Sequence, residues 1–104
     1  MGAMSEYTEM LDEQEKNYAA RYSALTSLPA SISQLNHLQQ LDLTGNQLIS
    51  LPETIGNLAS LKQLYLDENQ LSSLPEALGS LSNLEELHID ANLLTSLPVS
   101  IDRL

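Results

Sequence analysis

The apolar residues of this chain recur at fixed places, and the interval is 23 residues. The segment 38–60 carries eight Leu or Ile side chains and no aromatic residue. The next segment, 61–83, matches it at 13 of 23 positions without a gap, and a third copy runs from 84 to 104. Residues 25–37 fit the last thirteen positions of the same unit. Such a period is typical of solenoids, in which each unit has an apolar side that only its neighbours cover.

Each copy predicts the same succession of elements. It opens with Leu-x-x-Leu-x-Leu, whose last part alternates apolar and variable residues, as a half-buried strand does. One asparagine per unit follows, and we expect its side chain to hydrogen-bond the backbone of its own and the neighbouring unit. One proline per unit then fits the first turn of a short α- or 3₁₀-helix that returns on the outer side. These residues are Asn46, Asn69 and Asn92, and Pro29, Pro52, Pro75 and Pro98.

The resulting pattern, L-x-x-L-x-L-x-x-N-x-L-x-x-L-P-x-x-I/L, resembles the leucine-rich repeat family over residues 25–104. It looks most like the 23-residue intracellular branch, which is also found in Ras-associated and many bacterial repeat proteins. The resemblance implies an α/β fold, a curved solenoid with a parallel sheet on its concave side. It also implies a protein-binding role, because the family commonly has one. The family further occurs as the recognition part of kinases, GTPases and ubiquitin ligases.

The residues before Leu25 depart from the repeat. Four apolar or aromatic side chains lie near one face at helical spacing, and acidic residues near the start suit a helix N-terminus. We therefore predict an amphipathic helix over 5–22 that covers the open end of the solenoid. A partner-binding or coiled-coil helix is the alternative. The stripe comprises Tyr7, Leu11, Tyr18 and Tyr22.

The remaining boundaries follow from the period. Residues 1–4 are interpreted as a remnant of expression cloning, and 23–37 as a partial unit. Full units span 38–60 and 61–83, and a truncated unit spans 84–104. The last unit is expected to expose apolar side chains, which a further part of a longer array or a second copy could cover, unless the last turn frays. These side chains are Leu94, Leu97, Ile101 and Leu104.

Strand alternation also predicts which side chains face away from the core. Three positions per unit lie on the concave face, and they vary between copies, whereas the leucine framework does not. A surface with one tyrosine, one histidine and several acids suits protein binding, with Tyr65 as the candidate anchor. A solvated face without a partner is the alternative. The predicted partner-binding residues are Gln40, Asp42, Thr44, Gln63, Tyr65, Asp67, Glu86, His88 and Asp90.

Composition narrows the classes of partner that this chain is expected to bind. The formal net charge is −10, with only four Lys plus Arg, which argues against nucleic acid and anionic membrane surfaces. A protein with a basic or mixed surface is the expected partner. The chain has no cysteine and no N-glycosylation sequon, which favours the cytoplasm. No apolar run approaches the roughly 18 residues that span a bilayer.

The sequence offers little for catalysis. Glu86, His88 and Asp90 alternate along one strand, so successive side chains are roughly 6.5–7 Å apart, too far for all three to share one metal ion. There is no cysteine nucleophile, and the four glycines form no phosphate-binding loop. We therefore expect neither an enzyme nor a cofactor. Two alternatives to a simple binding module stay open: the recognition arm of a larger enzyme, and a structural repeat that self-associates.

Overall fold

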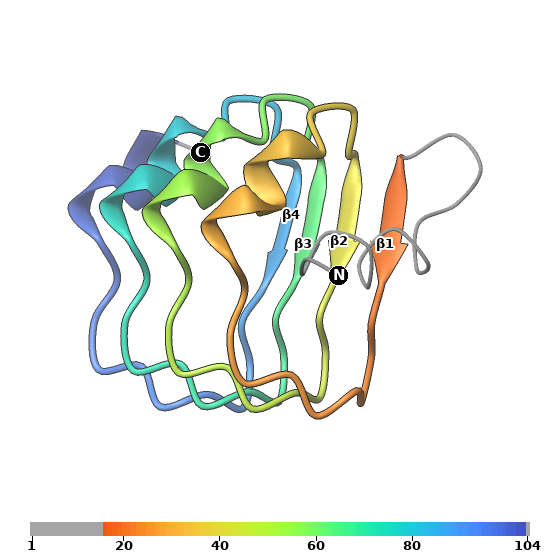
Figure 1. Cartoon of the computed structure of the whole chain (residues 1–104). Coiled ribbons are helices and arrows are strands. Elements are labelled where there is room, and N and C mark those ends of the chain that lie inside the picture. Colours follow the sequence, from red (N-terminus) through yellow and green to blue (C-terminus); the bar gives the residue numbers. More distant parts are fainter. Residues whose placement is uncertain (1–15, 104) are drawn as a thin grey trace.

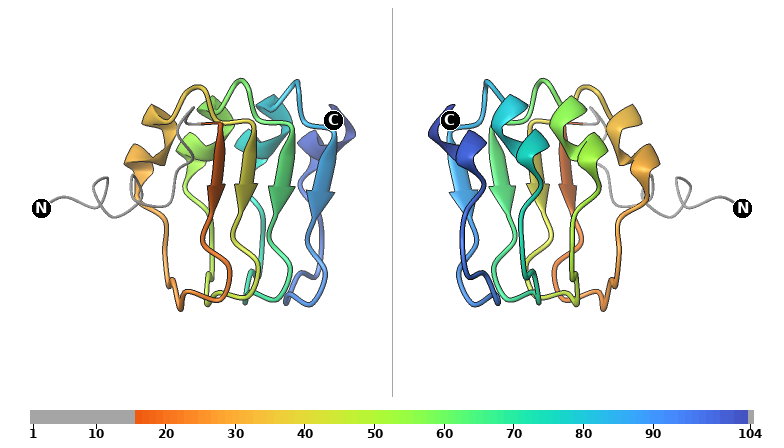
Figure 2. Two further views of the ribbon diagram at one scale, coloured as in Figure 1. Left: turned by 90° about the vertical axis from the view of Figure 1, so that its right-hand side faces the viewer. Right: turned by 90° about the vertical axis from the view of Figure 1, so that its left-hand side faces the viewer.

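The computed structural model of the chain describes residues 16–103, and in it the 23-residue period becomes four stacked coils. Each coil consists of a short strand, a turn, an extended segment and a 3₁₀-helix (Figure 1). The strands form one side of the stack and the 3₁₀-helices lie along the other, as both side views show (Figure 2). The predicted solenoid is confirmed.

The four strands form one parallel sheet in the order β1-β2-β3-β4. Every strand has three residues, and each begins 23 residues after the one before. The register aligns equivalent positions of neighbouring units, for example Leu41 with Leu64 and Leu64 with Leu87. The bounds are Asn17–Ala19 for β1, Gln40–Asp42 for β2, Gln63–Tyr65 for β3 and Glu86–His88 for β4.

The returns are 3₁₀-helices of five residues that each start directly after a proline. The Ile55 N–H donates to the Pro52 carbonyl over 3.0 Å, the i to i+3 bond that defines this helix. Proline suits the position because its φ is already close to the required value and its missing N–H is not needed there. The bounds are Ala30–Gln34 for η1, Glu53–Asn57 for η2, Glu76–Ser80 for η3 and Val99–Arg103 for η4.

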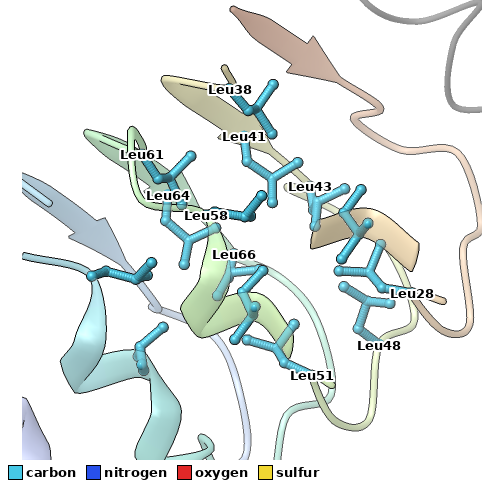
Figure 3. Packing of buried hydrophobic residues seen from close by; sticks show 14 of the residues in the cluster. Leu28, Leu38, Leu41, Leu43, Leu48, Leu51, Leu58, Leu61, Leu64 and Leu66 are labelled. Atoms are coloured by element: carbon cyan, nitrogen blue, oxygen red, sulfur yellow. The ribbon is translucent and has the colours of Figure 1, made fainter. Parts of the chain in front are cut away.

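The core is a column of leucines between the sheet and the returns (Figure 3). Leu41 and Leu43 of one coil and Leu64 and Leu66 of the next are completely buried. Burial of a leucine side chain contributes roughly 1.5–3 kcal/mol. Each coil supplies one layer of this column, so no coil buries its own leucines without a neighbour.

The predicted asparagine contacts are confirmed. Asn69 donates through Nδ2 to the Leu66 carbonyl of its own coil and to the Leu43 carbonyl of the preceding coil, both over 3.0 Å. Its Oδ1 accepts the Leu48 N–H over 3.1 Å. Asn46 and Asn92 repeat the arrangement. Among the described residues, no buried side-chain nitrogen or oxygen lacks a partner.

The helix predicted over 5–22 is wrong where the structure describes that segment. Residues Asn17–Ala19 form strand β1, which pairs with β2 and places Tyr18 opposite Leu41. Tyr18 and Ala20 are each 2% exposed, because they fill the places that leucines fill in later coils. The first coil therefore starts earlier than the predicted partial unit at 23. The rest of the predicted helix, 5–15, lies outside the described residues.

The last coil exposes part of its apolar surface, as predicted. Leu97 is 51% exposed, whereas Leu51 and Leu74 hold the same position in earlier coils and are 7% exposed. Leu94 and Ile101 are half-buried against the core, so their predicted exposure is only partial. Leu104 lies outside the described residues.

Candidate functional site

The outward-pointing side chains of β2, β3 and β4 form one polar surface, which we call the sheet face. The middle residue of each strand points into the core, so the first and third residues point outward. The register aligns them in two rows, as the sequence predicts. The rows are Gln40–Gln63–Glu86 and Asp42–Tyr65–His88.

Two aromatic rings stack on this face. The ring centroids of Tyr65 and His88 lie 4.8 Å apart with an interplanar angle of 26°. His88 Nε2 also lies 3.4 Å from Glu86 Oε1. Side chains that lie directly opposite on adjacent strands are close enough for such contacts. The stack holds the two rings against each other on the sheet face.

The surroundings of this pair are negatively charged. Partial burial, and then the charges of Glu86 and Asp42, raise the pKa of Tyr65 above its ordinary value. Each of these effects favours the neutral phenol over the phenolate. At neutral pH Tyr65 therefore presents an uncharged ring between carboxylates.

Asp42 bonds to neighbouring segments of the chain, which the sequence does not predict. Its Oδ1 accepts both the Thr44 hydroxyl over 2.7 Å and the Thr44 N–H over 3.1 Å. Its Oδ2 lies 3.5 Å from Nε of Arg21. Thr44 is only 7% exposed, so the prediction that it lies open on the concave face is wrong. The Thr44 hydroxyl is nevertheless satisfied, because Asp42 Oδ1 accepts its hydrogen bond in place of water.

The third predicted row is also tied into the turns. The Asp90 N–H donates to Asp67 Oδ1 over 2.6 Å, so that carboxylate joins the third coil to the fourth. Asp67 is half-buried and Asp90 is exposed. Both acids add negative charge at the rim of the sheet face rather than at its centre.

Sequence reasoning missed Arg21 and Tyr22, which the early start of the first coil brings to this rim. The Tyr22 hydroxyl donates to Glu68 Oε2 over 2.7 Å, 46 residues along the chain. Its ring lies directly over Gly45, where an added Cβ would approach the ring carbons to 2.2 Å. Gly45 has φ +75°, which favours glycine independently. The signal for this coil is the 23-residue period itself. When it is projected backwards, Tyr18 and Ala20 fall at positions that leucines occupy in later coils.

The sheet face holds no arrangement suited to a metal ion. Within residues 16–103 no group of three or more His, Cys, Asp or Glu side chains converges as metal ligands do. No helix in that same stretch is long and apolar enough to cross a membrane. What the face can do chemically is donate and accept hydrogen bonds, stack and attract positive charge.

Comparison with known families agrees with this architecture. The model of a leucine-rich repeat region matches residues 19–104. The chain belongs to the leucine-rich repeat family. Among curated proteins, none matches the sequence.

Solved structures share the fold. A leucine-rich repeat protein of Leptospira interrogans is 46% identical over 77% of this chain, with a TM-score of 0.76. The BIR3–SERK2 complex of Arabidopsis thaliana is 31% identical over 83%, with a TM-score of 0.73. The Toll–Spatzle complex of Drosophila is 31% identical over 77%, with a TM-score of 0.71.

The chain is much shorter than these proteins. It spans 20% of the Leptospira chain, 48% of the Arabidopsis chain and 11% of the Drosophila chain. The likeness therefore concerns the repeat region.

Proposed function

We propose that this chain is a protein-interaction module that binds a partner with a basic or mixed surface on its sheet face. One observation carries the proposal. Side chains with no part in the leucine core, above all the stacked Tyr65 and His88, stand beside carboxylates on a rigid sheet. Rigid aromatic side chains are favoured anchors of interfaces because little entropy is lost when they bind.

Two further facts support a protein partner. Two of the similar structures, BIR3–SERK2 and Toll–Spatzle, are complexes between proteins. The chain has 14 Asp plus Glu against four Lys plus Arg, so a basic surface is the electrostatic complement. We propose that the chain binds rather than catalyses, because the polar side chains of the sheet face either hold the local fold, as Asp42 does through Thr44, or stack, as Tyr65 does on His88.

The test is capture from lysate followed by an affinity measurement on the captured partner. The double variant Tyr65→Ala, His88→Ala is compared with Gln47→Ala, Gln70→Ala, which changes two exposed side chains away from the sheet face. We expect the first variant to weaken binding at least about tenfold, as loss of an anchor does, and the second to leave it unchanged. Equal affinity of both variants and the parent contradicts the proposal.

The role of recognition arm in a larger enzyme is a second reading of the same surface. The reading frame of the full gene decides it, because a catalytic domain encoded beside the repeats is either present or absent.

Self-association is the third candidate function, and the exposed Leu97 of the last coil favours it. Leu97 is 51% exposed there, whereas Leu51 and Leu74 at the same position of earlier coils are 7% exposed, and β4 is the last strand in the order of the described sheet. Apolar side chains beside an open strand edge favour pairing with another chain. Light scattering at high concentration tests this: a mass of twice 11.4 kDa that returns to 11.4 kDa in Leu97→Glu supports a homodimer. A single-chain mass for the parent contradicts it.

We further propose that the module works in the cytoplasm. The absence of cysteine and of glycosylation sequons supports this placement. Fractionation of cells that produce the natural protein tests it, and recovery from the medium or the cell exterior contradicts it.

A further inference from the structure

Arg21 places a positive charge at the rim of the sheet face, where it pairs with Asp42. Its Nε lies 3.5 Å from Asp42 Oδ2, while Asp42 Oδ1 accepts two hydrogen bonds from Thr44. Both carboxylate oxygens of Asp42 therefore have partners within the chain. The Asp42 side chain is 14% exposed, whereas that of Glu86 is 49% exposed. A cation of a partner that approaches Asp42 thus competes with Arg21 for Oδ2.

A second contact holds Arg21 in this position. Its guanidinium carbon lies 5.7 Å from the centre of the Tyr22 ring, within the roughly 6 Å over which an aromatic ring attracts a cation. The ring has contacts of its own, because the Tyr22 hydroxyl donates to Glu68 Oε2 over 2.7 Å and the ring lies over Gly45. These contacts join three coils, so the fold itself brings Arg21 to Asp42.

The ion pair lies beside the proposed anchor. The register of β2 and β3 aligns Asp42 with Tyr65, and the charge of Asp42 helps to raise the pKa of Tyr65. A partner that contacts Tyr65 therefore comes close to Arg21 as well. The Arg21 side chain is 55% exposed, so it can leave Asp42 for water without any change in the leucine core.

We propose that Arg21 is an internal competitor of the basic partner, because its guanidinium occupies the place on Asp42 that a cationic side chain of the partner takes on binding. This inference rests on the proposed function and adds a residue that limits the affinity of the same surface. The apparent affinity of a site falls with the fraction of molecules in which the site is free. Removal of Arg21 should therefore strengthen binding.

Calorimetric titration of the 104-residue chain with blocked hexa-lysine at about 0.01 M salt tests the competition, because charges are little screened there. Arg21→Gln removes the competitor and one positive charge. Lys62→Gln removes the same charge from an exposed side chain three residues before Tyr65, roughly 10 Å along the strand, and is the matched control. We expect Arg21→Gln to bind hexa-lysine about 1.5- to 5-fold more tightly than Lys62→Gln, as one exposed ion pair allows.

Two further measurements locate the effect at Asp42. Asp42→Asn keeps an oxygen for Thr44 but loses the charge with which Arg21 pairs, so the difference between Arg21→Gln and Lys62→Gln should vanish in that background. In the parent, the Nε–H signal of Arg21 should shift in nuclear magnetic resonance spectra as hexa-lysine is added, because the guanidinium leaves Asp42.

The outcomes separate this inference from the proposed function. Equal affinity of Arg21→Gln and Lys62→Gln, or an Arg21 signal that is unchanged at saturation, overturns the competition but leaves an acidic binding face in place. A gain in Arg21→Gln that persists together with Asp42→Asn also overturns it, because the effect then does not pass through Asp42. Binding of hexa-lysine by none of these proteins contradicts both the competition and the basic partner.

Discussion

At the scale of single residues, the repeated asparagine holds neighbouring coils together. Asn69 is 6% exposed and makes four hydrogen bonds with the backbone of its own and the preceding coil, to Leu43, Leu48, Leu66 and Asp67. The turn it occupies has no regular ladder, so these backbone groups depend on the side chain. Removal of a partner leaves buried donors and acceptors unsatisfied, which costs about 1–3 kcal/mol for each group.

We expect Asn69→Ala to lower the free energy of unfolding by about 2–4 kcal/mol, because several buried groups lose their partner together. Urea denaturation measures the change. Asn83→Ala is the matched control, since Asn83 also donates to a backbone carbonyl, that of Ala59, but at an exposed site. The control should lose less than about 1 kcal/mol, and equal losses in the two variants would contradict the account.

A second prediction at this scale concerns Tyr22. Its hydrogen bond to Glu68, and then the charge of that carboxylate, raise the pKa of Tyr22 above the ordinary value of 10.0. The fold thus favours the neutral phenol. The stability that the hydrogen bond of the neutral Tyr22 phenol contributes is fully present below pH 10.0. It is lost as the pH rises through the raised pKa of Tyr22 in the folded state.

Denaturation at a series of pH values from about 9 to 12 should therefore show a steeper loss of stability in the parent than in Tyr22→Phe, which has no phenol to ionise. Tyr65 ionises in both proteins, so the difference reports on Tyr22. Identical pH profiles would show that the bond to Glu68 contributes nothing.

At the scale of elements, the sequence predicts the strands β2 to β4, the 3₁₀ returns and the asparagine turns because each recurs in phase. It does not predict β1. Tyr18 and Ala20 replace the strand leucines and Ser23 replaces the asparagine, while a helical stripe of tyrosines competes with the strand pattern. The strand is favoured over the helix because Tyr18 is buried opposite Leu41, which lies 23 residues further along the chain. A contact over that distance leaves no signal in the local sequence pattern.

In the candidate site, too, the sequence predicts some positions and not others. The rows of the sheet face follow from the two-residue period of strands and from the register that the repeat imposes. The low exposure of Thr44 and the position of Arg21 do not, because they depend on turn geometry and on the misassigned first coil. Where the sequence pattern is periodic, it predicts the direction in which a side chain points. Where one coil differs from the others, the position of its side chains is known only from the contacts of the folded chain.

The assignment of β1 makes a prediction about Tyr18. If it fills a leucine position, Tyr18→Leu should retain most of the stability, because leucine occupies that place in the coils that follow. Tyr18→Ala should lower the free energy of unfolding by about 3–5 kcal/mol, as deletion of a large buried side chain does. Thermal or urea denaturation of both variants measures this. Equal effects of Leu and Ala would contradict the buried strand position.

At the scale of the whole molecule, charge opposes compactness. The chain carries a formal net charge of −10, and the described part measures 35 × 27 × 20 Å. At about 0.01 M salt the screening length is roughly 30 Å, so most of the carboxylates repel one another across the molecule. Above about 0.5 M salt that length falls below roughly 5 Å, and the repulsion is confined to near neighbours.

Added sodium chloride should therefore stabilise the fold. We expect the urea midpoint to rise between about 0.01 M and 0.5 M salt, because self-repulsion of a highly charged chain destabilises its compact state. The same salt should weaken binding of a basic partner, since that attraction is screened as well. A midpoint that falls with salt would mean that favourable ion pairs such as Arg21–Asp42 outweigh the repulsion.

The central claim, that partners bind the sheet face, is tested most directly by photo-cross-linking. A photoreactive amino acid is placed at Gln63, beside Tyr65 on the sheet, or at the exposed Glu53 in η2 on the opposite side of the stack (Figure 2). The account predicts that one partner is cross-linked from Gln63 and not from Glu53. Cross-linking of that partner from Glu53 alone would place recognition on the 3₁₀-helices and contradict the account.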